Sequence, residues 1–166
     1  KQELDKLAKQ GNTAAVTAAG WDPGLDSVLR AAFRVAAPTG ITYTNYGPGM
    51  SLGHSVAARS AAGVEDAVAI TYPLGSGRHR RLVYAKLEPG ADPQGVRAEI
   101  AAMNYFKNDE LVFTVTDDLG DARDCGHGMV IERKGSSGAT HNQRLSCSFI
   151  INNPAITTQV MVMAAR

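Results

Sequence analysis

Residues 45–54 read Asn45-Tyr46-Gly47-Pro48-Gly49-Met50-Ser51-Leu52-Gly53-His54, and the predicted fold is arranged around this stretch. A strand-like run, 41–46, precedes it, and a helix-like run, 55–62, follows it. Glycine permits positive φ and the close approach of a ligand, and proline sets the turn that starts the loop. A strand, a glycine-rich loop and a helix start favour an anion site, because free N–H groups point out of a helix N-terminus.

The glycine spacing does not match a dinucleotide fingerprint. Gly47, Gly49 and Gly53 form G-x-G-x-x-x-G, one residue longer than the usual motif. The acidic partner expected about 20 residues later is missing, because Thr71-Tyr72-Pro73 stands in that place. Spacing alone slightly favours a structural turn without a ligand.

Composition excludes several classes of protein. The chain has 166 residues, of which 44% are hydrophobic and 20% charged, as in one ordinary globular domain or one and a half. A formal charge of +1 provides no bulk attraction to nucleic acid or membrane. Two cysteines, Cys125 and Cys147, are too few for a disulfide framework, so a reducing cytoplasm is the simplest expectation.

Two other chemistries have weak support. Cys125 and His127 are the only close pair of metal-binding residue types, so we expect no metal site. The letters around Ser51 match G-x-S-x-G, but a nucleophile elbow also needs a later acid and histidine. Asp117 or Asp118 would have to serve as the acid, and His127 or His141 as the histidine. A hydrolase is therefore a remote alternative.

Hydrophobic periodicity predicts an α+β fold. The chain opens on a helix at 3–10 and a buried strand at 13–19, as at the end of a parallel α/β sheet whose earlier part is absent. We then expect a mixed, largely antiparallel sheet of about five to six strands with helices packed on one face. The remaining segments read as a helix at 25–35, a hairpin at 65–72 and 80–88, a helix at 92–103, strands at 111–116, 129–133 and 144–151, an irregular loop at 117–128, and a helix from 155.

Polar residues at the ends of these elements are candidates for a ligand site. Asp22 follows the only tryptophan, Trp21, at a strand end, although it would also suit a helix cap. Arg81 falls on the apolar-leaning face of its strand, where an arginine needs an anionic partner, unless it ends the strand in solvent. Thr71, Arg81, His127 and Asn153, if they converge, would suit an amino acid's carboxylate.

Three motifs resemble the meso-diaminopimelate dehydrogenase family: residues 20–24 (Gly-Trp-Asp-Pro-Gly), 46–54 and 73–81. The likeness continues in order to Asn152-Asn153-Pro154. The family reversibly removes ammonia from the D-centre of meso-2,6-diaminopimelate with NADP and gives L-2-amino-6-oxopimelate, a step of lysine biosynthesis. The resemblance implies a tail of a truncated Rossmann domain at 1–20, a dimerisation and substrate-binding domain at 21–151, and at 152–166 the start of a helix returning to the missing domain.

The same resemblance implies roles for individual residues. Trp21 and Asp22 correspond to residues beside the reacting D-centre, and the loop with Tyr46, Met50, Leu52 and Gly53 to one that closes over the substrate. Thr71, Arg81, His127 and Asn153 correspond to residues that hold the distal L-centre. NADP would bind to the missing domain and not to this chain, with Asn153 adjacent to it at most. Some members carry Gln at Leu52 and Asp at Val56, so this chain resembles a branch that is laxer towards other D-amino acids.

The resemblance also implies a cytoplasmic homodimer without nucleic-acid or membrane partners, and a fragment that is inactive alone. Two rivals remain: a dimerisation module without chemistry, and the substrate domain of another Rossmann-linked oxidoreductase. Pairs of small residues would suit close packing between subunits in the first, namely Ala31-Ala32, Ala57-Ala58 and Ala61-Ala62.

Overall fold

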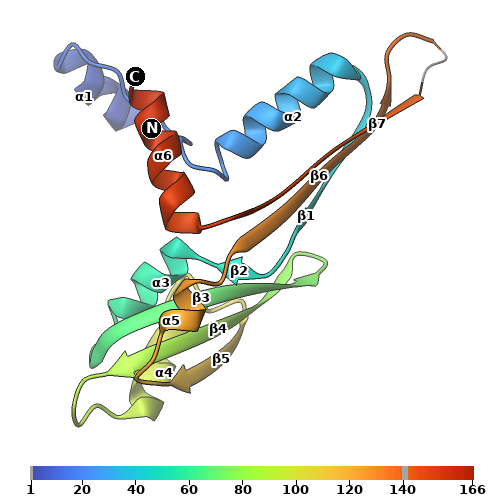
Figure 1. The fold of residues 1–166 in the computed structure, drawn as a ribbon. Coiled ribbons are helices and arrows are strands. Elements are labelled where there is room, and N and C mark those ends of the chain that lie inside the picture. The colour runs from blue at the N-terminus through green and yellow to red at the C-terminus, as the bar shows by residue number, and fades with distance from the viewer. Residues whose placement is uncertain (1, 140–141) are drawn as a thin grey trace.

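The chain forms two β-sheets, and the glycine-rich stretch lies between them (Figure 1). A computed structural model describes residues 2–139 and 142–166. In chain order the elements are α1 (Gln2–Gln10), α2 (Leu25–Ala36), β1 (Thr39–Tyr46), β2 (Gly49–Met50), α3 (Leu52–Arg59), β3 (Val64–Gly75), β4 (Arg78–Leu87), α4 (Pro93–Ala102), β5 (Glu110–Val115), α5 (Gly120–Arg123), β6 (His127–Ser136), β7 (Asn142–Ile151) and α6 (Asn153–Ala165).

The four-stranded sheet has the order β2-β3-β4-β5 and contains the larger core. The pairs β2–β3 and β3–β4 are antiparallel, and α4 connects β4 to its parallel neighbour β5. One face packs on α3 and α4, through Ala58, Val96 and Ile100. The other face packs Val68 against Leu119, beside α5. Residues 67–70 are therefore buried without alternation, because both faces of β3 are covered.

The three-stranded sheet has the order β1-β6-β7 and is antiparallel throughout. Met129 and Ile131 of β6 point to one face, where they pack with Trp21 and partly buried residues of α2. The other face carries exposed apolar side chains, including Ile41 at 61% exposure and Ile150 at 80%. This face is uncovered in the single chain, and it also carries charged side chains, among them Glu132, Lys134 and Arg144.

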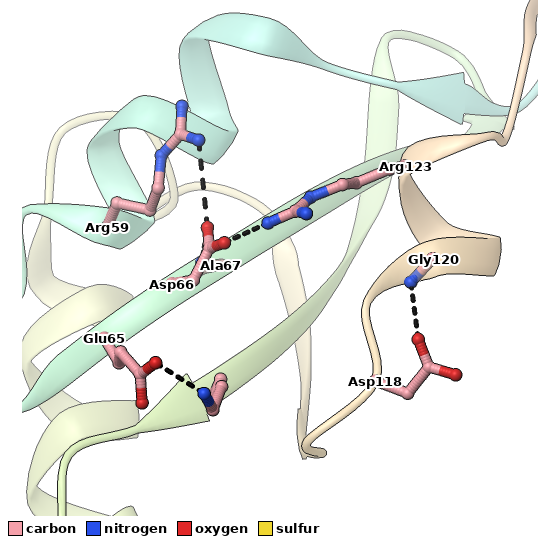
Figure 2. Close-up of polar contacts among 8 residues, drawn as sticks. Arg59, Glu65, Asp66, Ala67, Asp118, Gly120 and Arg123 are labelled. Carbon is pink, nitrogen blue, oxygen red and sulfur yellow. Dashed lines mark hydrogen bonds and ion pairs between the residues drawn. The ribbon is translucent and has the colours of Figure 1, made fainter.

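Ion pairs and a cap hold α5 against the four-stranded sheet, as Figure 2 shows. Asp66 of β3 contacts Arg59 of α3 at 3.8 Å and also pairs with Arg123 of α5. The Asp118 carboxylate accepts a hydrogen bond from Gly120 N–H at 2.8 Å at the start of α5. Exposed pairs of this kind contribute little energy, but they fix where the chain enters β6.

The α+β class and the mixed, largely antiparallel pairing are confirmed, but the strands divide between two sheets instead of forming one. The strand predicted at 13–19 is wrong: this segment is exposed and pairs with no strand of the described ranges. A strand needs a neighbour for its backbone N–H and C=O groups. The predicted loop 117–128 is also wrong in part, because it contains α5 and the first two residues of β6.

Several other expectations are confirmed with small shifts in their bounds. Asp92 caps α4 by accepting from Gln94 N–H at 3.1 Å and Gly95 N–H at 2.9 Å. Asn152 caps α6 by accepting from Ala155 N–H at 3.1 Å.

The domain boundaries expected at residues 20/21 and 151/152 stay a prediction. In the parts of the chain that the structure describes, no helix is long and apolar enough to cross a membrane.

Candidate functional site

Two adjoining cavities lie at the junction of the two sheets, and Asp22, Ser51 and His127 line both of them. The first, which we call the hairpin cavity, has about 570 Å³ and extends to the β3–β4 hairpin. The second, the α6 cavity, has about 540 Å³ and extends to α6. Of the predicted site residues, Tyr46, Thr71 and Arg81 line only the hairpin cavity, and Trp21, Leu52, Gly53 and Asn153 line only the α6 cavity.

Trp21 connects three separate elements at the floor of the site. Its side chain is 5% exposed, and its indole N–H donates to Asn153 Oδ1 at 3.1 Å. Asn153 Nδ2 donates in turn to the carbonyl oxygen of Met50 at 3.0 Å. The ring of Trp21 meets the ring of His127 edge-on, with centroids 4.9 Å apart. Met50 lines neither cavity; its side chain is buried beside Val68, so it takes part through its backbone.

Asp22 does not cap the helix that follows it. Gly24 is the N-cap residue of α2, and its N–H donates to Asp26 Oδ1 at 3.1 Å. The alternative in which Asp22 serves only as a cap is therefore wrong. Its carboxylate lies where the two cavities meet.

Tyr46 lines the hairpin cavity together with Asp22. Burial, followed by the negative charge of Asp22 and a hydrogen bond to it, raises the pKa of Tyr46 to about 12. The phenol is thus protonated at neutral pH and can donate. Arg30 Nη2 lies 3.5 Å from the phenol oxygen, while its Nε donates to buried Asp26 at 3.1 Å, so α2 also holds Tyr46 in place.

Arg81 is buried and has an internal anionic partner. It is 8% exposed, its Nε donates to Asp109 Oδ2 at 2.6 Å, and its Nη1 donates to the hydroxyl of Thr71. Thr71 and Arg81 face each other directly across the β3–β4 pair, so the hairpin brings them together as expected. The alternative in which Arg81 ends its strand in solvent is wrong. Nη2 is the fork nitrogen without a protein partner in the described ranges, and the residue lines the hairpin cavity.

Asp109 is the site residue that sequence reasoning missed. It precedes β5, and β5 lies parallel to β4 with Leu111 opposite Arg81, which brings the carboxylate to the guanidinium. The sequence signal was an acidic residue directly before a predicted strand. The contact of Asp109 with Arg81 depends on the parallel pairing of β4 and β5 across α4, and hydrophobic periodicity does not reveal that pairing.

His127 lies on a strand and not in a loop. It begins β6, where it pairs with Ile151, and it faces both cavities. Burial lowers the pKa of its imidazole, and the negative charge of Asp22 opposes this shift with a smaller effect. The net lowering of the pKa favours a neutral ring. Its Nδ1 is shielded and lacks a hydrogen-bond partner among residues 2–139 and 142–166, which leaves Nε2 for a ligand.

The glycine loop accommodates His127. A Cβ on Gly49 would lie 2.5 Å from the Cα atom of His127, which no ordinary side chain permits. Gly47 N–H donates to the carbonyl oxygen of Gly128 at 2.8 Å. Gly49 therefore lets β6 approach β2, and neither glycine forms a cradle for a pyrophosphate.

Ser51 does not form the nucleophile elbow that the remote hydrolase alternative requires. Its Oγ lies 2.8 Å from His54 Nδ1, and His54 Nε2 lies 3.1 Å from the carbonyl oxygen of Tyr105 instead of a carboxylate. Burial, assisted by the charge of Arg81, lowers the pKa of His54 to about 4. A histidine with so low a pKa is a poor general base at neutral pH. His141 lies outside the described residues.

Comparisons with known proteins agree with this architecture. A family model described as "Diaminopimelic acid dehydrogenase C-terminal domain" matches residues 20–77. The meso-diaminopimelate D-dehydrogenase of Bacteroides fragilis is 45% identical over 166 residues, which is 100% of this chain and 56% of that protein. The enzyme of the same name from Lysinibacillus sphaericus is 35% identical and covers 98% of this chain. The chain thus spans about half the length of the curated relatives that it matches.

Solved structures of the same kind share the fold. Corynebacterium glutamicum diaminopimelate dehydrogenase in complex with DAP superposes with a TM-score of 0.62 at 27% identity, covering 84% of this chain and 50% of that one. An engineered D-amino acid dehydrogenase bound to NADP+ superposes with a TM-score of 0.68 at 26% identity, covering 89% and 52%. By sequence and by fold, this chain is a relative of the C-terminal portion of the meso-diaminopimelate dehydrogenase family.

Proposed function

We propose that this chain is the substrate-binding part of an NADP-dependent meso-2,6-diaminopimelate D-dehydrogenase, which converts the D-centre reversibly to a ketone with release of ammonia in lysine biosynthesis. The observation that carries the proposal is the division of charge in the site. A carboxylate, Asp22, lies where the two cavities meet, and a buried guanidinium, Arg81, lines only the hairpin cavity. A molecule with an ammonium at one end and a carboxylate at the other suits this division.

The reacting end of the substrate would lie at Trp21 and Asp22. Asp22 accepts hydrogen bonds from the amine of the D-centre, and the packed ring of Trp21 excludes water on one side. NADP, held by a part of the protein outside this chain, would supply the acceptor for the hydride of the D-centre carbon. The chain's own contribution is to orient that carbon and to keep the amine in place.

The distal L-centre would be held by Arg81, Thr71 and His127. Arg81 has Nη2 for a carboxylate, and His127 has Nε2. Asn153 contributes less than the resemblance implies, because Oδ1 already accepts from Trp21 and Thr157, and Nδ2 already donates to Met50. We assign it mainly to holding Trp21, with one N–H left for substrate or cofactor.

Specificity at the loop would depend on Leu52 and not on Val56. Leu52 lines the α6 cavity, whereas Val56 is 53% exposed and lines neither cavity. Where some members of the family carry Gln, Leu52 provides no polar contact for the substrate. A pocket with one polar contact fewer is consistent with tolerance of simpler D-amino acids.

NADP would bind to a part of the whole protein outside this chain. The glycine loop does not fit a dinucleotide, since Gly49 is packed against His127. A cytoplasmic location is also part of the proposal and rests on two free cysteines, Cys125 and Cys147.

The second candidate is a dimerisation module without chemistry. The uncovered face of the three-stranded sheet exposes the apolar side chains of Ile41 and Ile150, and we propose a homodimer through it. The small-residue pairs favour it less, because Ala58 and Ala61 are buried in the four-stranded core. A homodimer is compatible with the proposed enzyme. A dimerisation module without chemistry, in contrast, would give the residues that line the cavities no function.

Steady-state kinetics distinguish the two candidates. The full-length protein that contains this chain is mixed with NADP and either meso- or L,L-diaminopimelate, and NADPH formation is followed by absorbance. We expect turnover with the meso isomer only, because the L,L isomer has no D-centre. A folded, NADP-binding protein that turns over neither isomer would contradict the proposal.

A further inference from the structure

Ser51 lies where both cavities meet and has no role in the assignments above. Its Oγ is 2.8 Å from His54 Nδ1, and His54 Nε2 is 3.1 Å from the carbonyl oxygen of Tyr105. The imidazole is held edge-on by two rings, with centroids 5.1 Å from Tyr105 and 5.3 Å from Phe106. This is a chain of hydrogen bonds that ends at the cavities.

The direction of each hydrogen bond follows from elementary chemistry. A carbonyl oxygen only accepts, so His54 Nε2 carries the hydrogen that binds Tyr105. A neutral imidazole has a single N–H, so Nδ1 accepts and the Ser51 hydroxyl donates to it. The ring is neutral because burial, then the charge of Arg81, lowers the pKa of His54 to about 4.

Ser51 Oγ therefore presents only lone pairs to the cavities. Asp22, which lines the same two cavities, also accepts hydrogen bonds and does not donate them when ionised. Two acceptors that line the same cavities suit a ligand group rich in N–H donors.

We infer that Ser51 Oγ accepts a hydrogen bond from the nitrogen of the substrate's D-centre, and that His54 is a positioning residue that keeps this hydroxyl an acceptor. The inference rests on the proposed function. Both the ammonium and the neutral amine have N–H groups to donate. Once the amine is neutral, acceptance of its N–H by Ser51 and Asp22 leaves the nitrogen lone pair free to form the C=N bond as hydride leaves.

The first test is substitution of Ser51 in the full-length protein with saturating NADP. Ser51→Ala is expected to raise the KM for meso-diaminopimelate about 10- to 100-fold, the range for a hydrogen bond to a charged group, with little change in the KM for NADP. Ser51→Thr keeps the hydroxyl and restores a KM close to that of the wild type. The Ser51 side chain makes no capping bond to α3, and thermal unfolding of the variant checks that loss of its bond to His54 leaves the fold intact. Ser60→Ala, at the other end of α3, is the matched control.

The second test separates positioning from packing at His54. His54→Asn keeps an acceptor oxygen at the place of Nδ1, whereas His54→Gln keeps a donor at the place of Nε2 and loses the acceptor. We expect a KM near that of the wild type for Asn and a KM as high as that of Ser51→Ala for Gln. A residue that only packs would give equal effects.

The outcomes also separate this inference from the proposed function. If the wild-type protein turns over meso-diaminopimelate but Ser51→Ala leaves the KM unchanged, or the two His54 variants behave alike, the inference is overturned and the function stands. If the folded wild-type protein has no such turnover, both fall together.

Discussion

Arg81 and Asp109 form a pair of opposite charges with side chains only 10% and 12% exposed. A buried cation needs such a partner, and the pair fixes the fork so that Nη2 is left for the ligand. The same geometry means that substrate binding does not have to neutralise an isolated charge. Arg81 thus makes a structural contact through one edge of its guanidinium, and in the proposed function it would bind the substrate through the other.

Replacing Arg81 tests its recognition role. Arg81→Ala in the full-length protein is expected to raise the KM for meso-diaminopimelate about 100-fold or more, because a charge-assisted contact is lost in a buried site. The KM for NADP should change little. Unchanged constants for diaminopimelate would refute the role.

A double-mutant cycle tests the structural contact. Arg81→Met alone should lower the free energy of unfolding by about 3 kcal/mol, because it leaves Asp109 buried and unpaired. Adding Asp109→Asn should recover part of that loss, measured by chemical denaturation. Strictly additive losses would show that the two side chains do not interact.

His54 predicts an acid-side loss of stability. Its folded pKa of about 4 is below the ordinary 6.5, so the unfolded chain takes up a proton first as pH falls. The free energy of unfolding should therefore be intact above about pH 6.5 and decline as pH falls towards 4. His54→Asn should lose this part of the decline in denaturation curves at pH 7.5, 5.5 and 4.5. Identical slopes for variant and wild type would contradict it.

At the scale of the elements, local patterns predicted most helices and strands but not their partners. Asp92 and Asn152 are capping residues that chemistry alone identifies, and both caps are present. Alternation shows which face of a strand is apolar, yet not which strand lies beside it. The two-sheet division and the Arg81–Asp109 contact both depend on pairings between distant segments, so they could not be predicted.

The glycine stretch shows what else the pattern concealed. Three glycines read equally well as a ligand loop or as a turn. In the structure, Gly49 lets β6 pass close to β2. The sequence could not predict this, because it does not show that His127 lies beside Gly49. The resemblance named many of the residues that line the two cavities, whereas the contacts of Asp109 and of the Ser51–His54 pair required coordinates.

The two glycines of this loop predict different tolerance to a methyl group. Gly49→Ala is expected to destabilise the protein by about 2 kcal/mol or more and to lower activity, because the new Cβ would meet backbone at 2.5 Å. Gly47→Ala is the matched control, since its Cβ would find its nearest neighbour at 3.5 Å. Thermal unfolding of both variants measures the difference. Equal shifts in Tm would contradict the packing argument.

At the scale of the whole molecule, the site belongs to neither sheet alone. His127 begins β6 of the three-stranded sheet and Asp22 precedes α2, which packs on that sheet, whereas Arg81 belongs to β4 and Ser51 follows β2 of the four-stranded sheet. Relative movement of the two sheets would therefore change the distance between the ends of the substrate site. The uncovered face of the three-stranded sheet is available to hold that sheet in place through a second copy.

A charge on this face should weaken the proposed homodimer. Ile41→Glu is expected to raise the dissociation constant of the dimer about 100-fold or more, because a carboxylate would replace an apolar contact at the interface. Leu74→Glu, an exposed apolar position on the β3–β4 hairpin, is the control. Sedimentation of the full-length protein measures both. Equal dimer stability in both variants would exclude this face.

The most direct test of the charge-divided site is a crystal structure of the full-length protein with meso-diaminopimelate. We predict the nitrogen of the D-centre within hydrogen-bond distance of Asp22 and Ser51, and the L-centre carboxylate on Arg81 and Thr71. A substrate bound in the opposite direction, with a carboxylate beside Asp22, or bound outside both cavities, would contradict the account.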